Sequence, residues 1–548
     1  MEFNLAQVHE AVEATVPDRD CVIFRDRRLT YRQVGDRSRQ LANALRSRGL
    51  GEVTPRDQLR GHESGQDHLA VYLYNGNEYL EAMLGSYKAR VAPLNVNYRY
   101  VAEELLYLLT DSGARAVVYH SAFAPVLDEV RDQLPRLSVL LQVADDSGID
   151  LLDGAEWYED AVAGEPTDLP PDLAESWSPD DLYILYTGGT TGMPKGVLWR
   201  QADIFVGAMG GRKLDNEEFA SIEEIIATVS PDGAARMMPG PPFMHGAAHW
   251  MAFNAFTQGS TLVIPGVPER LDCPDVLSTV ATEGVNVLLI VGDAFARPLI
   301  DEIEQTTYDL SSLLAVVSGG AALSAGVKSR LLELMPSIII MDGLGASETG
   351  QQGRQTLVKG QGTSTGDFDP VEGMRILSED LTEVLPSGHD GMGWLAQAGR
   401  VPIGYLGDAD KSARTFPVID GVRYSVPGDR ARLTADDRLE LYGRESVTIN
   451  SGGEKIFAEE VEAAIVAHPA VVDCVVAGRP SERWGNEVIA IIALRPGVDA
   501  SDEDLLEEAG RHIARYKLPK AFVRRSQIQR SPSGKADYRW ATAQAVDG

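Results

Sequence analysis

The sequence predicts an α/β protein built of at least two domains. Helical periodicity alternates along the chain with short apolar runs, which is the pattern of helices that cover strands. The chain contains 548 residues, and a chain of this length divides into more than one hydrophobic core. Its charge changes character beyond residues 442–448. We therefore expect a boundary there, with domains at 1–443 and 444–548.

The first predicted helix covers residues 30–48, between a candidate N-cap at Thr30 and Gly49. The alternation continues with a helix at 78–88 and strands at 116–119, 139–141, 182–186, 285–291, 314–317 and 337–341. Polar segments rich in Gly, Pro and Asp at 51–68 and 145–180 lack an apolar period. We interpret them as surface excursions.

A loop rich in glycine and threonine follows the predicted strand at 182–186. Residues 186–196 read Tyr-Thr-Gly-Gly-Thr-Thr-Gly-Met-Pro-Lys-Gly. Glycines free backbone N–H groups to turn inward, while hydroxyls and a lysine add donors and charge, so the loop suits a polyphosphate. It is not a GxxxxGK[ST] loop, because Pro194 precedes Lys195 and Gly196 follows it. The residues expected at the phosphates are Thr187, Gly188, Gly189, Thr190, Thr191, Gly192 and Lys195. The alternative is a surface turn.

This loop resembles the phosphate loop of the adenylate-forming superfamily, which contains acyl-CoA synthetases, luciferases and the adenylation domains of peptide synthetases. Further motifs of that family occur downstream in the family's order. They are Ser318-Gly319-Gly320-Ala321-Ala322-Leu323, Asp342-Gly343-Leu344-Gly345-Ala346-Ser347-Glu348, Val426-Pro427-Gly428-Asp429, Tyr442-Gly443-Arg444 and Pro532-Ser533-Gly534-Lys535. The resemblance therefore covers essentially the whole chain.

The resemblance implies a binding site for ATP or AMP. Beyond the phosphate loop, its expected residues are Ser318, Gly319, Gly320, Ala321, Asp342, Gly343, Leu344, Gly345, Ser347, Asp429, Arg444 and Lys535. Among these, Asp429 and Arg444 would hold the ribose, and Ser347 would donate to the α-phosphate. Leu344 stands where the family usually stacks an aromatic residue on adenine, so an aliphatic face would replace the ring.

The family's chemistry implies three catalytic residues, two co-substrates besides the acid (ATP and coenzyme A), and Mg²⁺. A carboxylate attacks the α-phosphorus of ATP and expels pyrophosphate, and the thiol of coenzyme A then displaces AMP. Because negative charge gathers in the first step, Lys535 is expected to bridge the reacting oxygens. Glu348 is expected to hold Mg²⁺ against the phosphates. His245 lies in a segment that resembles the lining of the family's acyl tunnel, although a lone histidine can equally be structural.

The small domain at 444–548 would be a mobile α+β domain if the resemblance holds. In the family this domain closes over ATP and then rotates about a hinge to admit coenzyme A. The hinge position here is Ser446, where Asp or Lys is typical. Within 511–539, basic side chains face a single acid, Asp537: they are Arg511, Arg515, Lys517, Lys520, Arg524, Arg525, Arg530, Lys535 and Arg539. They indicate an anionic partner or, alternatively, a solvated face.

The predicted acid is apolar. No Asp, Glu, Lys or Arg occurs between Phe243 and Thr257, so no charged group is available there to bind an amino acid. The segments 204–211 and 244–256 combine Gly and Ala with Met and Phe, which suits a wide tunnel or, equally, ordinary helix packing. The sequence around these segments resembles bacterial acyl-CoA synthetases of steroid side-chain acids. The alternatives are a medium- or long-chain fatty acyl-CoA ligase, a carrier-protein-linked adenylation enzyme and a non-catalytic nucleotide-binding regulator.

A short segment also departs from the family pattern, as Leu344 and Ser446 do. Leu198-Trp199-Arg200-Gln201 replaces the Thr-His that usually follows the phosphate loop. This departure indicates a divergent subgroup.

Bulk composition restricts the partners. The chain has 50 Lys and Arg against 81 Asp and Glu, a net charge of −31, which opposes binding to nucleic acid or to an anionic membrane. Its three cysteines lie far apart and indicate neither a disulfide framework nor a zinc site. No signal peptide or transmembrane run is apparent, so we expect a cytoplasmic protein that is not transmembrane. The oligomeric state stays open, a homodimer included.

Overall fold

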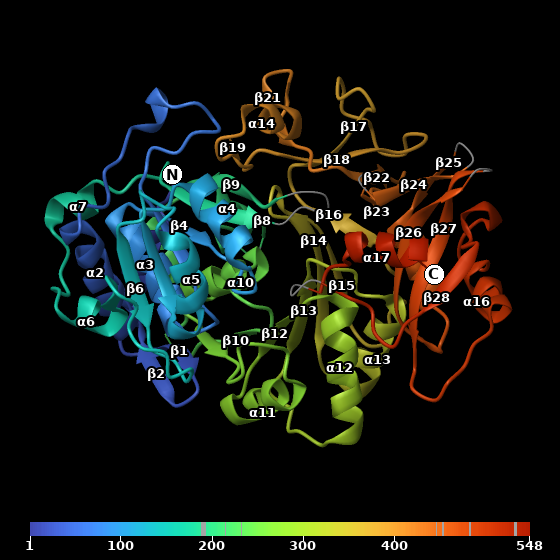
Figure 1. The fold of residues 1–548 in the computed structure, drawn as a ribbon, viewed down its shortest axis with the longest axis horizontal. Helices are drawn as coiled ribbons and strands as arrows, with labels where there is room; N and C mark the ends of the chain where they lie inside the picture. The colour runs from blue at the N-terminus through green and yellow to red at the C-terminus, as the bar shows by residue number, and fades with distance from the viewer. Residues whose placement is uncertain are drawn as a thin grey trace.

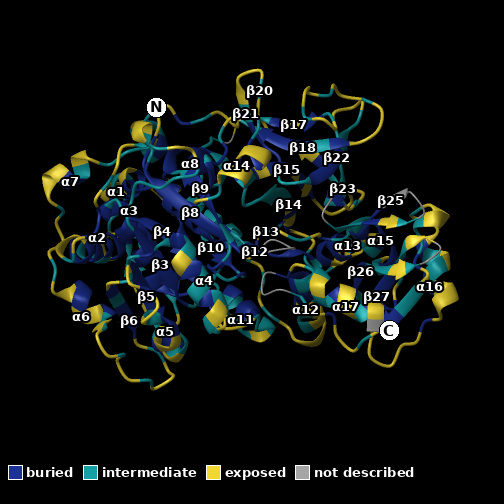
Figure 2. Cartoon of the chain, turned by 45° about the horizontal axis from the view of Figure 1, so that its top comes forward, coloured by how far each residue is buried: buried dark blue, intermediate teal, exposed yellow. Residues whose placement is uncertain are grey.

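The computed structural model describes residues 1–187, 193–213, 215–231, 233–444, 447–451, 454–481, 484–530 and 534–547. Two large sheets and their helices form the N-terminal part, and a small sheet forms the C-terminal part at the end of the molecule opposite α2 and α6 (Figure 1). Buried residues concentrate on the strands of the large sheets and on the helices between them (Figure 2). None of the helices in the described part of the chain is long and apolar enough to cross a bilayer.

The first large sheet has the strand order β19-β9-β8-β4-β3-β5-β6-β7. Its strands are parallel except where β9 pairs with β8 and β19. The strands are β3 (His68–Tyr72), β4 (Ala92–Asn95), β5 (Ala116–His120), β6 (Val139–Val143), β7 (Glu156–Trp157), β8 (Leu182–Thr187), β9 (Lys195–Arg200) and β19 (Gly404–Tyr405). The associated helices are α2 (Tyr31–Ser47), α3 (Asn77–Ala89), α4 (Ala102–Ser112), α5 (Ala124–Arg131), α6 (Tyr158–Ala163) and α7 (Pro171–Glu175).

The predicted helix at 30–48 is confirmed, and its first turn explains why it begins there. The Thr30 side chain accepts from the N–H of Gln33, and the Gln33 side chain accepts from the N–H of Thr30. This reciprocal capping box satisfies two N–H groups that the helix cannot satisfy itself. The predicted helix at 78–88 is α3.

The second large sheet runs from β2 to β20. Its strand order is β2-β1-β11-β10-β12-β13-β14-β15-β16-β23-β22-β18-β21-β20, with β17 paired to β18. The strands are β1 (Asp20–Phe24), β2 (Arg27–Thr30), β10 (Arg236–Pro239), β11 (Thr261–Ile264), β12 (Val287–Ile290), β13 (Ala315–Gly319), β14 (Ile339–Ala346), β15 (Gly350–Leu357), β16 (Asp367–Pro370), β17 (Met374–Leu377), β18 (Gly393–Ala398), β20 (Val418–Ile419), β21 (Val422–Ser425), β22 (Asp429–Leu433) and β23 (Leu439–Arg444).

The part of this sheet from β1 to β14 is parallel, and the pairing becomes antiparallel at β15. The predicted strands at 285–291, 314–317 and 337–341 are confirmed as β12, β13 and β14. The remaining helices of the N-terminal part are α1 (Leu5–Thr15), α8 (Gln201–Ala208), α9 (Ile222–Ala227), α10 (Gly246–Thr257), α11 (Cys273–Glu283), α12 (Gly292–Gln305), α13 (Ala325–Leu334) and α14 (Ala409–Thr415). Of these, α11, α12 and α13 form a hydrophobic core with one face of β12, β13 and β14.

The C-terminal part is an α+β unit. Its sheet has the order β25-β24-β27-β26, with β28 paired to β27. The elements are β24 (Thr448–Ser451), β25 (Glu454–Phe457), α15 (Ala458–Val466), β26 (Val471–Ser481), β27 (Gly485–Leu494), α16 (Asp502–Ala509), β28 (Ala521–Arg524) and α17 (Tyr538–Asp547). Residues of α15 and α16 join a core with one set of strand residues, and those of α17 join a core with the alternate set. The sheet is therefore covered on both faces.

The interpretation of 145–180 as a surface excursion is wrong in part. Tyr158 opens α6, is fully buried and donates to Glu81 Oε2 at 2.9 Å. Ala161 and Val162, three and four residues further on, are also buried. A helix of a single buried turn is too short to produce a visible apolar period, which is why the sequence pattern missed it.

Candidate functional site

A cavity of about 1010 Å³ separates the C-terminal part from the large domain. Its walls include the loop after β13, the end of β14, residues of β22 and β23, helix α15 and the segment before α17. Of the predicted nucleotide residues, Gly320, Ala321, Asp342, Gly343, Leu344, Gly345, Asp429, Arg444 and Lys535 line it. These residues come from motifs far apart in sequence. The cavity lies at the carboxyl ends of parallel strands, where α/β sheets bind ligands.

The predicted adenine loops lie side by side because β13 and β14 are parallel neighbours. Their register pairs Gly319 with Gly343. Asp342 is held from behind by Lys328, whose Nζ lies 2.7 Å from Asp342 Oδ2 and whose side chain is fully buried. Burial raises the pKa of Asp342, although Lys328 opposes that effect. Ser318 lies at the end of β13, where its Oγ accepts from the N–H of Gly292 at 3.2 Å.

Asp429 and Arg444 meet across the antiparallel pair of β22 and β23, which places the two residues directly opposite each other. Arg444 Nε donates to Asp429 Oδ1 at 3.0 Å. The Asp429 carboxylate raises the pKa of Arg444. The pair lines the cavity with one carboxylate oxygen outside this bond, so it can accept from a vicinal diol.

Glu348 and Ser347 are the central residues of a tight turn between β14 and β15. Thr349 N–H donates to the carbonyl of Ala346 at 3.1 Å, which closes the turn. The hydroxyl of Tyr405 donates to Glu348 Oε1 at 2.9 Å. Together with Asp429, the Glu348 carboxylate raises the pKa of Arg444, and it opposes the lowering of the Lys535 pKa by burial, so it lies close to the cavity's cations. One carboxylate beside bound phosphates is a typical Mg²⁺ environment, so these residues fit that ion.

Lys535 enters the cavity from the C-terminal part. Burial lowers the pKa of its ammonium, and Arg444 lowers it further, while Glu348 and Asp429 raise it. Lys535 also lowers the pKa of His245. The structure thus brings Lys535 together with the predicted catalytic and ribose-binding residues of the large domain.

His245 is the N-cap residue of α10. Burial, followed by Lys535, lowers its pKa to about 3, so the imidazole is neutral at pH 7. Its Nε2 is buried and has no hydrogen-bond partner in the described part of the chain. His249, by contrast, lies 3.0 Å from the Tyr183 hydroxyl and 3.2 Å from that of Tyr79. His249 is therefore a satisfied core histidine.

Some predicted residues are not placed at the cavity. Gly188, Gly189, Thr190, Thr191, Gly192 and Ser446 lie outside the described residues. Thr187 ends β8 and Lys195 begins β9 on either side of the phosphate loop. Lys195 Nζ lies 3.5 Å from Asp408 and 3.9 Å from Asp111. Lys195 is not among the described residues that line the cavity.

An apolar face of β13 and β14 continues from the adenine loops. Every second residue points to this face, and these residues are partly exposed while their neighbours are buried. The face carries Ala315, Val317, Ile339 and Met341, with exposed fractions of 40% for Ile339 and 42% for Met341. It points to the same side as Val287 of β12, which packs against the core that contains α10. Sequence reasoning missed this surface.

The expectation of a wide tunnel at Gly210 and Gly211 is wrong. A Cβ on Gly210 would lie 3.1 Å from Thr257, and one on Gly211 would lie 2.8 Å from the backbone of Phe205. The two glycines let segments pack closely, so they fill space rather than open it. Neither residue lines the nucleotide cavity.

The basic residues of 511–539 do not form one continuous anion-binding face. Several of them are paired with acids within the C-terminal part: Arg511 with Glu507 and Glu508, Lys517 with Glu460, Arg524 with Asp502 and Arg530 with Asp473. For these residues the structure favours the alternative to an anionic partner, because their charges are balanced by neighbouring acids of the same part.

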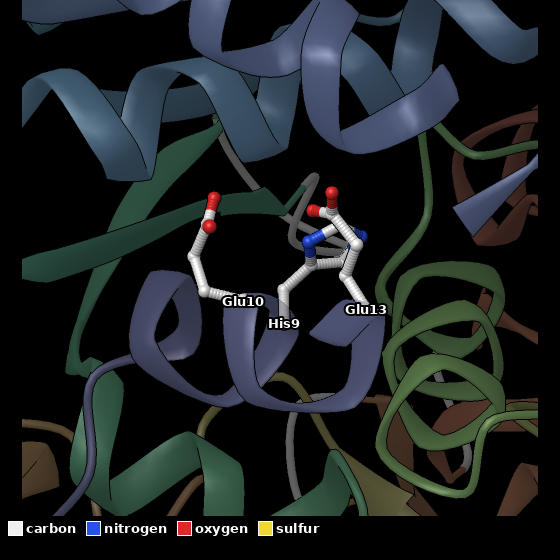
Figure 3. Close-up of side chains that lie close together, drawn as sticks. All are labelled: His9, Glu10 and Glu13. Atoms are coloured by element: carbon white, nitrogen blue, oxygen red, sulfur yellow. The ribbon is translucent and has the colours of Figure 1, made fainter. Parts of the chain in front are cut away.

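A cluster of His9, Glu10 and Glu13 lies on α1 (Figure 3). Its side chains lie close enough to share a metal ion. However, Lys88 Nζ lies 2.5 Å from Glu10 Oε1 and Arg39 Nη2 lies 2.8 Å from Glu13 Oε1. Because these cations already neutralise the carboxylates, the cluster is a buried ion-pair network.

The chain is similar to known proteins over almost its whole length. The family model "AMP-binding enzyme" matches residues 8–406, and the model "AMP-binding enzyme C-terminal domain" matches residues 460–535. The chain is 56% identical to the medium-chain acyl-CoA ligase Mig of Mycobacterium avium, covering 100% of this chain and 99% of that protein. It is 39% identical to a medium/long-chain-fatty-acid–CoA/3-oxocholest-4-en-26-oate–CoA ligase of Mycobacterium marinum, covering 99% and 96%.

Two solved structures share the fold. The anthranilate CoA ligase AuaEII in complex with anthranoyl-AMP superposes with a TM-score of 0.81 at 21% identity, covering 99% of this chain and 97% of that one. ATP-bound MatB from Rhodopseudomonas palustris superposes with a TM-score of 0.79 at 19% identity, covering 100% and 99%.

Proposed function

The chain belongs to the AMP-binding enzyme family, and on that premise we propose that it is an AMP-forming acyl-CoA synthetase. It joins an apolar carboxylic acid to coenzyme A through an acyl-adenylate, with ATP as the activating substrate. The observation that carries this proposal is the meeting of Lys535 with Asp429 and Arg444 around one cavity. Glu348 does not line this cavity, but its carboxylate is near enough to act electrostatically on Lys535. A nucleotide-binding regulator would have no need of an ammonium at this place.

In the first half-reaction the acid's carboxylate attacks the α-phosphorus, and pyrophosphate leaves. Lys535 is the cation placed to stabilise the charge that develops on the reacting oxygens. Asp429 and Arg444 hold the ribose, and neutral His245 borders the acyl carbonyl without adding charge. Mg²⁺, when bound near Glu348, would neutralise phosphate charge. In the second half-reaction the thiol attacks the acyl carbonyl, and AMP leaves.

We propose that the acid lies on the apolar face of β13 and β14. The face begins at Gly319 and Gly343, beside the predicted adenine loops, and continues for four residues to Ala315 and Ile339. That distance is about 13 Å at 3.3 Å per residue. Two neighbouring strands give a flat surface rather than a narrow slot, and a flat fused-ring body can lie against it. Our first candidate is therefore a steroid side-chain acid.

A medium- or long-chain fatty acid is the second candidate. The 56% identity to a relative named as a medium-chain acyl-CoA ligase favours it. The relative of 39% identity is named for both kinds of acid. The two candidate acids undergo the same adenylation chemistry. They differ only in the part of the acid that would lie against Val317 and Met341, a fused-ring body or an alkyl chain.

The test is a pyrophosphate-release assay with purified protein, ATP, Mg²⁺ and coenzyme A. A steroid side-chain acid, octanoate and palmitate are compared at equal concentrations, with acyl-CoA identified by mass spectrometry. We expect the steroid acid to give the highest kcat/KM. Turnover of fatty acids alone would reject the steroid proposal, and no pyrophosphate release with any acid would reject the synthetase.

We further propose a cytoplasmic location. Cys21, Cys273 and Cys474 are all free thiols, and ATP and coenzyme A are co-substrates of the reaction.

A further inference from the structure

Ser347 and Glu348 lie in one tight turn. The backbone carbonyl of each accepts a hydrogen bond from a side chain on a distant strand. Trp199 Nε1 donates to the carbonyl of Ser347 at 2.9 Å. The Ser425 hydroxyl donates to the carbonyl of Glu348 at 2.6 Å. Trp199 and Ser425 are fully buried. The turn's central peptides therefore cannot rotate without breaking a buried hydrogen bond, which is costly to leave unmade.

From this geometry we propose that Trp199 and Ser425 are positioning residues that fix Ser347 and Glu348 for adenylation. The inference rests on the proposed function, because it needs Ser347 and Glu348 to act on the phosphates. Neither Trp199 nor Ser425 lines the nucleotide cavity among the described residues. Both therefore act through the backbone of the turn.

The strand that carries Trp199 also links the turn to the phosphate loop. Lys195, the first residue of β9, and Trp199 are four residues apart, so both side chains point to the same face of the sheet. The neighbouring strand β19 pairs Tyr405 with Val197, which places Tyr405 on that face too. Tyr405 holds the carboxylate of Glu348 while Trp199 holds the preceding carbonyl. One strand pair thus sets Lys195 and the turn relative to each other.

This arrangement gives a reason for the departure at 198–201. An indole N–H projects far enough from β9 to reach the carbonyl of Ser347, which follows a strand of the other large sheet. The ring is fully buried in the core of the large domain. A smaller side chain at residue 199 would leave the carbonyl without its donor and a cavity in that core.

The test compares Trp199→Phe and Ser425→Ala with two matched controls. Trp177→Phe removes an indole N–H that donates to the carbonyl of Lys88 at 2.9 Å, away from the site. Ser86→Ala removes a fully buried hydroxyl that donates to the carbonyl of Ala82 at 2.7 Å. Each control loses the same kind of bond without touching the turn.

Three measurements are made on each variant. The first is acid-dependent exchange of pyrophosphate into ATP, which reports adenylation. The second is acyl-CoA formation from supplied acyl-adenylate. The third is equilibrium titration of Mn²⁺ into protein with a non-hydrolysable ATP analogue, followed by electron paramagnetic resonance, which needs no turnover. Thermal unfolding reports the stability of each variant.

We expect Trp199→Phe and Ser425→Ala to lower pyrophosphate exchange by about tenfold to a hundredfold, since a small displacement of a catalytic group has effects of that size. They should weaken Mn²⁺ binding and leave acyl-CoA formation from acyl-adenylate within about twofold of wild type. The controls should change only the melting temperature. If Trp199→Phe does not fold, Ser425→Ala decides the question by the same criteria.

Two results would overturn the inference while leaving the proposed function intact. One is loss of pyrophosphate exchange no greater than in the matched controls. The other is an equal loss in both half-reactions, which would indicate general damage. A wild-type protein that exchanges no pyrophosphate with any acid would instead reject the proposed function itself.

Discussion

Lys535 brings its ammonium into the nucleotide cavity from the C-terminal part, whereas the groups around it belong to the large domain. Its expected contribution is confined to one step, because charge on the α-phosphate oxygens increases during adenylation and not during attack by the thiol. A single substitution at Lys535 can therefore separate the two half-reactions.

Lys535→Ala should cripple adenylation and spare thioester formation. A single electrostatic stabiliser is worth about 3 to 5 kcal/mol, which corresponds to roughly a hundredfold to several-thousandfold in rate. Pyrophosphate exchange measures the first step, and acyl-CoA formation from synthetic acyl-adenylate measures the second. Lys520→Ala, on the same domain, is the control. Comparable losses in the two steps would contradict this division of labour.

Glu348→Gln should raise the Mg²⁺ concentration needed for half-maximal adenylation. The amide keeps the shape of the side chain and its bond from Tyr405 but removes the charge that attracts the ion. We expect a shift of at least tenfold in a Mg²⁺ titration at saturating ATP. An unchanged titration would place the ion elsewhere.

Glu459 provides a pH prediction at the junction of the two parts. It is buried at the start of α15, and the N–H of Arg444 donates to its Oε1 at 3.4 Å. Burial raises its pKa to about 7. Because the folded carboxyl binds its proton more tightly than the unfolded one, its contribution is present below about pH 4.5 and is lost as pH rises through 7.

Glu459→Gln should therefore flatten the fall in stability between pH 4.5 and 7. The wild type should lose up to about 3 kcal/mol through this group over that range. Urea unfolding at pH 5, 6, 7 and 8, followed by tryptophan fluorescence, measures the slope. Glu462 carries a pKa raised to about 8 by burial, so some slope persists in the variant. A variant with the full wild-type slope would show that Glu459 ionises freely.

At the scale of elements, the strand pair β13 and β14 contributes both to the predicted nucleotide site and to the proposed surface for the acid. Their carboxyl ends bear the predicted adenine loops, and their alternate residues form the apolar face. Val316 and Ile340, on the opposite face, pack into the core with α11, α12 and α13. Substitutions on the apolar face can therefore affect the acid without disturbing that core.

Ile339→Lys should reduce kcat/KM for long apolar acids by at least tenfold, about 1.4 kcal/mol. An ammonium on this face would have to lose water against hydrocarbon when the acid binds. Kinetics with a steroid acid, palmitate and butyrate measure the effect, and butyrate should be insensitive. Val422→Lys, at an equally exposed valine of β21, is the control. Equal sensitivity of butyrate would mean that the acid does not reach Ile339.

These elements also show what sequence reasoning can recover. The loops after β13 and β14 were predictable because each is a contiguous motif that follows a predicted strand, and residues of both loops line the cavity. Trp199, Ser425 and Tyr405 were not, because each acts on Ser347 or Glu348 across a large separation in sequence. The apolar face was missed because alternate exposure depends on which side the helices cover. Gly210 and Gly211 misled because small residues serve close packing as well as open space.

At the scale of the whole molecule, the two parts meet around the cavity rather than through one shared core. The cores of the C-terminal part contain no residue before Val447 among those described. Strand β23 of the large sheet ends at Arg444, so this residue belongs to the large domain although the predicted boundary assigned it to the small one. The next strand, β24, belongs to the small sheet. The chain between them includes Ser446, which lies outside the described residues.

Ser446→Pro should permit adenylation and block thioester formation. Proline fixes φ near −65° and so opposes a rotation about this residue. Rapid quenching and chromatography should find acyl-AMP in near-stoichiometric amount with the enzyme and little acyl-CoA. The control is Ser501→Ala, at the cap of α16, which tests whether the domain tolerates a substitution away from the hinge. Ser451→Pro is not suitable, because Ser451 is paired in β24. Normal acyl-CoA yield would place the pivot at another residue.

The delivery of Lys535 by the small domain has a consequence for the direction of the reaction. Adenylation is chemically reversible, and the same ammonium that assists departure of pyrophosphate also assists its return. Any displacement of the C-terminal sheet withdraws that ammonium while Asp429 and Arg444 keep their place on the large domain. The intermediate is then still bound but can no longer be converted back to ATP at a useful rate. Domain movement would therefore make adenylation effectively irreversible and leave reaction with coenzyme A as the only productive path for the acyl-adenylate.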